Sequence, residues 1–241
     1  MNRLKIPILA FIFCFLSGCA TAIPKQNVQN CHKIIPVSIL IDRMAEKNLQ
    51  SVSISTDTLI AGANKIFQDE GLNFQYQVSS VTLLSYEESD KFVEAIVEAI
   101  NERSENKFRE FLKKQELGKV TIYLIGNRKY FWRLAGYRTG GGALTGEISY
   151  LDSTVPNGYG AFFIFARSTD LVKLDLIRLI VHEQGHLFLG YGFFFRGSIH
   201  SMLPSDFMSG DVSSNEKKKF GWRSKKRINR ILQEIKQVQC N

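Results

Sequence analysis

The feature that most constrains this 241-residue chain is a pair of histidines set four residues apart within an apolar stretch. His182 and His186 enclose Glu183, and the surrounding residues 176–189 are largely Leu, Ile, Val and Phe. This pattern predicts a buried helix, on which residues four apart lie on the same face. Buried charged or polar groups are costly unless they are paired. The chain must therefore fold so that these three side chains gain a partner.

A metal ion is the partner that suits this spacing. Two imidazoles one helical turn apart can both reach a single zinc ion. Glu183, next to the first histidine, can deprotonate a zinc-bound water instead of binding the metal. A metal-free pair of core histidines is the alternative, but it would leave the Glu183 carboxylate uncompensated. We therefore expect His182 and His186 to bind one Zn²⁺ and Glu183 to be the catalytic base.

A catalytic zinc normally has three protein ligands and one open position. The chain has only four histidines, and after His32 the one that remains is His200. Asp206, Asp211 and Glu216 are alternative third ligands. Neutral imidazole is the better partner for zinc, so we expect His200 to complete the set.

Met208 follows His200 by eight residues, in the stretch HSMLPSDFM. Together with the two-histidine helix, this stretch resembles the metzincin metallopeptidases, and the matrixins in particular, in which the third histidine precedes a Met-turn. The resemblance covers about residues 34–236. It departs from the family pattern at Leu189, where metzincins usually have Gly, and in the extra segment 193–197 before His200.

The resemblance implies both a fold and an activity. The fold would be α/β of the α+β type, with a mixed twisted sheet packed by helices and a C-terminal helix after the Met-turn. Met208 would lie beneath the metal as a hydrophobic floor. The activity would be zinc-dependent endopeptidase cleavage of a peptide or protein substrate, which could pair with an edge strand at 143–151.

Hydrophobic periodicity predicts the remaining elements, and a composition with 44% apolar and 22% charged residues is that of one globular domain. A capping box of Ser213 and Glu216 predicts the start of the last helix. Strands are expected at 34–41, 74–78, 120–125 and 161–166, and helices at about 55–71, 87–114 and 171–189.

The N-terminus predicts export. Arg3 and Lys5 precede an apolar run at 6–16, which is typical of a secretory signal and too short to span a bilayer. The run ends in Leu-Ser-Gly-Cys, which resembles the lipobox of bacterial lipoproteins, so Cys19 would become acylated. An ordinary cleaved signal is the alternative. We expect a signal peptide at 1–18, a lipid-anchored linker at 19–33 and the catalytic domain at 34–241.

The lipobox resemblance also bears on location. Ala20 follows Cys19, where lipoproteins retained in the inner membrane have Asp, so we expect a cell-envelope lipoprotein of the outer membrane if the host is Gram-negative. Cys31 and Cys240 could then pair as a disulfide in an oxidising exterior. A competing idea is that Cys31, beside His32, blocks a metal site.

The net charge of +8 is a local feature, because nine of the basic residues lie in 217–236. Such a basic face can meet anionic lipid or nucleic acid, but a solvated amphipathic helix has the same pattern. We expect a monomer that contacts the membrane through its lipid anchor and binds no nucleic acid. The alternative to the peptidase is a zinc-binding surface lipoprotein that is catalytically silent or is not a peptidase.

Overall fold

The computed structural model describes residues 31–101, 119–127, 129–130, 141–145, 160–166, 173–189, 205–209, 217–235 and 238–240. Residues 31–239 form one compact unit. The predicted signal peptide and the linker before Cys31 lie outside the described residues. Among the helices of the described part, none is both long and apolar enough to cross a bilayer.

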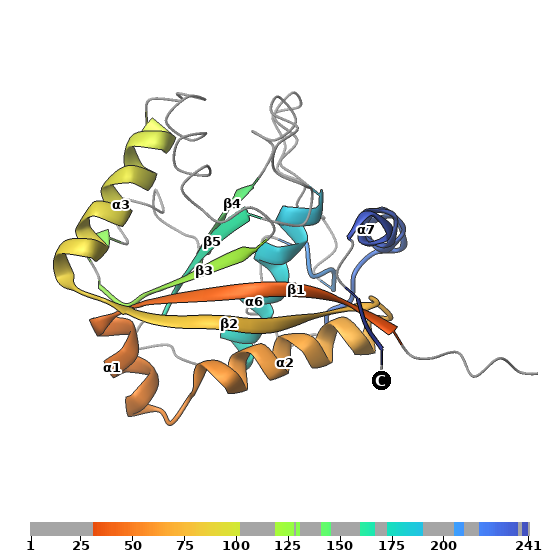
Figure 1. The fold of residues 1–241 in the computed structure, drawn as a ribbon, viewed down its shortest axis with the longest axis horizontal. Helices are drawn as coiled ribbons and strands as arrows, with labels where there is room; N and C mark the ends of the chain where they lie inside the picture. Colours follow the sequence, from red (N-terminus) through yellow and green to blue (C-terminus); the bar gives the residue numbers. More distant parts are fainter. Residues whose placement is uncertain are drawn as a thin grey trace, which may run out of the picture. The chain divides into compact units, whose positions relative to one another are not determined.

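The centre of the fold is a six-stranded sheet (Figure 1). Its main path has the order β2-β1-β3-β5-β4, and the first four of these strands are parallel. β4 is antiparallel to β5 and lies at one edge, while β6 pairs with β1. The strands are β1 (Cys31–Asp42), β2 (Phe74–Leu84), β3 (Val120–Ile125), β4 (Gly141–Thr145), β5 (Gly160–Phe165) and β6 (Val238–Cys240).

Helices cover both faces of the sheet. α2 and α6 lie side by side over one face, where alternate strand residues such as Ile122 and Phe162 form the core with them. The intervening Tyr123 points to the other face, where its ring lies 4.2 Å from that of Phe92 on α3. The described helices are α1 (Arg43–Ser51), α2 (Thr56–Asp69), α3 (Tyr86–Asn101), α6 (Lys173–Leu189) and α7 (Trp222–Glu234). The predicted mixed α/β sheet packed by helices is confirmed.

Several element boundaries differ from the predicted ones. β1 begins three residues early and β2 continues to Leu84, because the two strands pair along most of their length from Lys33 opposite Phe74. α1 was not predicted, because its sequence is mostly polar and it buries only Ala45, Asn48 and Leu49. The predicted edge strand is present but begins at Gly141, and residues 146–151 lie outside the described part.

The predicted capping box is wrong as the start of the last helix. α7 begins at Trp222, after Gly221, and residues 217–221 are not helical. Lys219 instead pairs with the segment around Asp206: its N–H donates to Ser205 O at 2.7 Å, and its O accepts from Phe207 N–H at 3.0 Å. These two bonds use the backbone that a helix starting near residue 214 would need.

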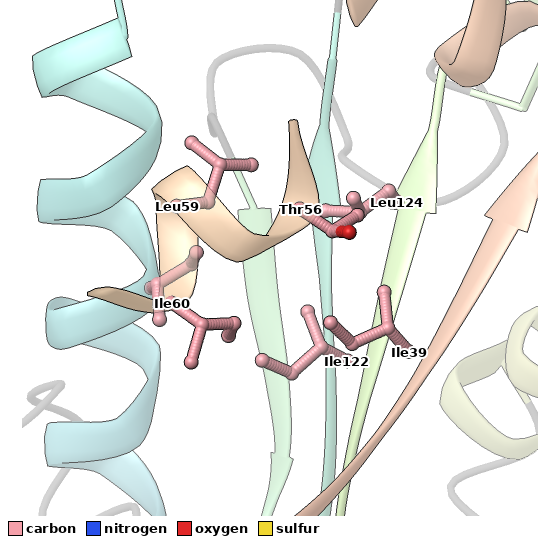
Figure 2. A pocket seen from close by; sticks show the side chains of 7 residues that line it. Ile39, Thr56, Leu59, Ile60, Ile122 and Leu124 are labelled. Atoms are coloured by element: carbon pink, nitrogen blue, oxygen red, sulfur yellow. The ribbon is translucent and has the colours of Figure 1, made fainter. Parts of the chain in front are cut away.

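A small apolar pocket lies between the sheet and the helices α2 and α6 (Figure 2). Thr56 contributes its only polar side chain, and the pocket lining has no titratable group that could activate this hydroxyl for catalysis. It is therefore a gap in core packing and not a candidate active site. Its lining residues are Ile39, Thr56, Leu59, Ile60, Ile122, Leu124 and Ile180.

Asp42 joins the carboxyl ends of two central strands. The side chain is buried and caps α1, accepting a hydrogen bond from Ala45 N–H at 2.6 Å. Its second oxygen accepts from Gly126 N–H at 2.8 Å and from Asn127 N–H at 3.3 Å, just after β3 ends. One carboxylate therefore serves three backbone donors.

We expect Asp42→Ala to lower the free energy of unfolding by about 2–4 kcal/mol, because it removes a helix cap and leaves a buried amide without an acceptor. Urea unfolding at neutral pH measures this loss. Asp57→Ala, in the exposed first turn of α2, is the matched control and should cost less than about 1 kcal/mol. A loss below that value for Asp42→Ala would contradict the role given to this side chain.

Candidate metal centre

The predicted site lies on α6, which is the most deeply buried helix of the described part. Every residue from Ile180 to Leu189 is buried, because α6 contacts α2, α7, β4 and β5. His182 is 5% exposed, Glu183 3% and His186 2%. The helix therefore holds two imidazoles and a carboxylate in surroundings where polar groups interact strongly with their partners.

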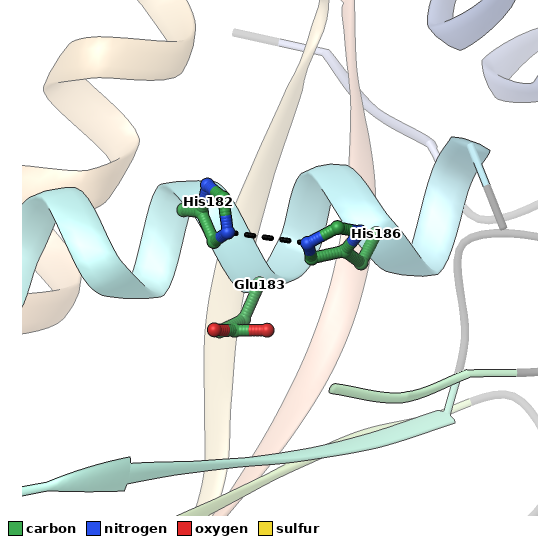
Figure 3. A group of neighbouring side chains, drawn as sticks. All are labelled: His182, Glu183 and His186. Atoms are coloured by element: carbon green, nitrogen blue, oxygen red, sulfur yellow. Dashed lines mark hydrogen bonds between the residues drawn. The ribbon is translucent and has the colours of Figure 1, made fainter. Parts of the chain in front are cut away.

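The two histidines face one another across one helical turn (Figure 3). Nε2 of His182 lies 3.1 Å from Nε2 of His186, and the rings are perpendicular at 89°. Two nitrogens bound to one tetrahedral zinc at 2.0–2.1 Å lie about 3.3 Å apart. With Glu183, the ligand atoms all fall within 4.8 Å of one another. The donor set and its spacing therefore fit a single divalent ion.

A backbone carbonyl fixes which nitrogen of His182 faces that position. Nδ1 of His182 lies 2.6 Å from Phe207 O. A carbonyl can only accept a hydrogen bond, so Nδ1 carries a proton, and in the neutral imidazole Nε2 presents its lone pair towards His186. Histidines that bind metals are commonly oriented in this way by an outer hydrogen bond.

The turn that supplies this carbonyl is itself held in place. Asp206 Oδ1 accepts from Met208 N–H at 2.9 Å, and Ser209 N–H donates to Asp206 O at 3.0 Å. Met208 is 1% exposed and packs against Gly185, where any Cβ atom would overlap with Met208 Sδ. Glycine between the two histidines therefore lets the turn approach α6 closely.

Gln184 anchors a different side of the same helix. Its Oε1 accepts a hydrogen bond of 2.5 Å from the hydroxyl of Tyr76 on β2. Burial raises the pKa of Tyr76 well above its ordinary value, so the hydroxyl remains a donor across the physiological range. Asn64 on α2 pairs with both backbone groups of Tyr76. The hydrogen bond between Tyr76 and Gln184 therefore opposes rotation of α6 about its axis.

The structure brings together His182, Glu183 and His186 as predicted, and it puts Met208 against the same helix. Among the described residues, these three form the only cluster suited to a metal, and Asp206 is not part of it. Asp206 holds the turn instead.

Four other predicted site residues stay predictions. His200, Asp211, Glu216 and Cys19 lie outside the described residues. Cys31 opens β1 and Cys240 ends β6, and these two strands pair, but the disulfide stays a prediction.

Two contributors were missed from the sequence. The role of the Phe207 carbonyl could not be predicted from the sequence, because every residue has a backbone carbonyl. Gln184 did leave a signal: an amide on a helix that is predicted to be buried needs a hydrogen-bond partner. Its partner, Tyr76, lies 108 residues away in the chain, and no spacing rule connects the two.

Comparison with known proteins gives no family. No protein-family model matches the chain, and no curated protein matches it. Among solved structures, the chain is similar to one described as "Structure of a chaperone-substrate complex", with 14% identity and a TM-score of 0.47 over 85% of this chain. The match spans 34% of that structure's chain. Function must therefore be inferred from the site.

We expect Gly185→Ala to weaken metal binding by about tenfold to a hundredfold, with zinc as the probe. The new methyl group displaces Met208, which shifts the turn and the Phe207 carbonyl that orients His182. Competition with a chelator of known affinity measures the change.

Gly62→Ala is the matched control for this variant. Its methyl group would meet the flexible end of Ile177, on α6 but more than one turn before His182. Zinc affinity should be unchanged in this control. An equal loss in both variants, or none in Gly185→Ala, would show that the turn does not support the metal.

Proposed function

We propose that this protein is a zinc-dependent endopeptidase in which His182 and His186 hold the metal and Glu183 is the catalytic base. One observation carries the proposal: two buried imidazole nitrogens face each other at 3.1 Å with a buried carboxylate beside them. A scaffold protein has no use for a proton acceptor at that position. The sequence resemblance to metzincins supports His200 as the third ligand.

The metal, when bound, would polarise the scissile carbonyl and acidify the attacking water. The chain's own residues provide the remaining chemistry. Glu183 accepts a proton from that water and returns it to the departing amine. Phe207 keeps the Nε2 lone pair of His182 directed to the site, and burial of α6 keeps bulk solvent from competing.

The edge of the sheet supports a peptide as the substrate. β4 is antiparallel to β5 and neighbours α6, and its other edge has no partner strand in the described part of the chain. An extended peptide can add to such an edge by backbone hydrogen bonding. This arrangement would carry a substrate past the helix that bears His182 and Glu183.

We also propose that the chain is a bacterial envelope lipoprotein acylated at Cys19. Its support is the apolar run that ends in Leu-Ser-Gly-Cys and the position of the compact unit, whose first strand begins at Cys31. The intervening residues would connect a lipid anchor to the catalytic domain. This proposal is independent of the metal centre.

The peptidase is tested with the chain starting after Cys19. We expect one zinc per chain, chelator-sensitive cleavage of a denatured protein mixture, and a loss of about 10²–10⁴ in kcat for Glu183→Gln with zinc retained. Glu87→Gln, on the exposed start of α3, is the matched control and should cleave normally. Cleavage that survives Glu183→Gln would remove the proposed base.

Ligand variants complete this experiment. His182→Ala and His186→Ala should lose zinc, His200→Ala should weaken its binding, and His32→Ala should retain it. Unchanged metal content in His200→Ala would return the third position to Asp211 or Glu216. Zinc without cleavage would favour the zinc-binding lipoprotein that is not a peptidase, and absence of zinc would overturn the metal centre.

The lipid anchor is tested in cells. We expect Cys19→Ala to move the protein from the membrane to the soluble fraction after a high-salt wash, because acyl chains and not charge would hold the native protein there. Fractionation followed by immunoblotting measures this, and Cys31→Ala is the control that should stay with the membrane. Salt-resistant retention of Cys19→Ala would contradict acylation at this residue.

A further inference from the structure

Helix α7 exposes a row of positive charges. Arg223, Lys226, Arg227 and Arg230 are all exposed and follow the spacing of a single helical face. We call these four residues the cationic stripe. Three apolar side chains lie roughly opposite the stripe and pack into the core, and each is at most 3% exposed: Ile228, Ile231 and Leu232.

The charge of the stripe is not neutralised within the described residues. Glu234 is the only carboxylate in α7, and no ion pair of the described chain involves the stripe. Lys225 differs, because its Nζ lies 2.9 Å from Oε2 of the largely buried Glu70. Lys225 therefore fastens the helix to the protein, whereas the cationic stripe faces solvent.

An exposed tryptophan adjoins the stripe. Trp222, the first residue of α7, is 70% exposed, and the Arg223 guanidinium carbon lies 5.8 Å from its ring centroid. A large aromatic side chain exposed next to cations is typical of surfaces that meet the lipid headgroup region, where the ring and its N–H are both satisfied.

The C-terminal end of α7 contacts β1, the first strand after the N-terminal segment. Lys33 Nζ, on β1, donates to Ile235 O at 2.7 Å, just after α7 ends. Cys19 lies twelve residues before Cys31, and such a length of chain spans at most about 40 Å. An anchor at Cys19 would therefore keep α7 within reach of the bilayer and raise its effective concentration there.

We propose that the cationic stripe and Trp222 dock on an anionic phospholipid surface. The stripe pairs with lipid phosphates and Trp222 enters the headgroup layer, while the apolar face of α7 stays packed in the protein. Docking is therefore peripheral and sensitive to salt. It uses the proposed anchor only for reach and does not depend on the metal centre.

The test uses the chain from Ala20 onward, which has no acyl group, so failure of acylation at Cys19 cannot affect it. Vesicles of phosphatidylcholine are compared with vesicles containing about 30% phosphatidylglycerol, a composition that gives the anionic potential on which such docking depends. The chain has two tryptophans, so Trp132→Phe makes the emission report Trp222 alone. We expect co-sedimentation with anionic vesicles only, reversal by salt and a blue shift of the emission.

Charge variants isolate the surface. Lys226→Gln with Arg227→Gln should weaken vesicle binding by about 30-fold, since each cation near an anionic surface contributes about fivefold. Arg43→Gln with Lys47→Gln, an exposed pair on α1, removes the same charge and should change binding little. Trp222→Ala, which keeps the charge, should also weaken binding.

Three results with vesicles would overturn the proposal. These are equal binding to neutral and anionic vesicles, equal losses in the two charge-variant pairs, and binding without a shift of the Trp222 emission. Tighter binding to a DNA duplex than to anionic vesicles at the same ionic strength would assign the stripe to nucleic acid instead. Thermal unfolding of each variant shows that a loss of binding is not a loss of fold.

Discussion

Burial of α6 is the constraint on which the rest of the site depends. A helix buried along ten consecutive residues carries two histidines, a glutamate and a glutamine, and each polar group needs an interaction that water no longer provides. The structure meets this need from two directions. Tyr76 on β2 bonds Gln184, and the turn at Phe207 bonds His182. Together these bonds fix the rotation of the helix about its axis. The facing nitrogens of the two histidines are therefore a consequence of the hydrogen bonds that satisfy the buried polar groups.

The turn at 205–209 is equally dependent on what surrounds it. Asp206 closes it, Lys219 pairs with it, and Gly185 gives Met208 room to approach the helix. Phe220 continues this packing, with its ring centroid 5.1 Å from that of Phe207. The candidate metal centre is therefore built from one helix, one turn and the segment that leads into α7, and we expect a change in any of these to reach the histidines.

The sequence predicted what local patterns encode. β3 was placed at its observed limits, because a mostly apolar run of six residues is bounded by glycines, and the helix expected from about residue 55 matches α2, which Ser55 caps. The His-Glu-x-x-His pattern was noticed because its four-residue spacing puts both imidazoles on one face of a helix. What escaped prediction involves distant contacts: Asp42, which caps α1, also bonds residues after β3, and α7 starts late because Lys219 pairs with Asp206. His200 lies outside the described residues, so the third ligand remains a prediction.

The backbone pairing of Lys219 with residues 205 and 207 couples the proposed membrane-docking surface to the candidate metal centre. It connects the segment entering α7 directly to the turn whose Phe207 carbonyl contacts His182. If α7 docks on a bilayer as proposed, this pairing would hold the candidate metal centre at a set height and angle above it. A substrate of the proposed peptidase would then be selected by geometry, according to how far a peptide segment extends from the membrane, before any side chain is recognised.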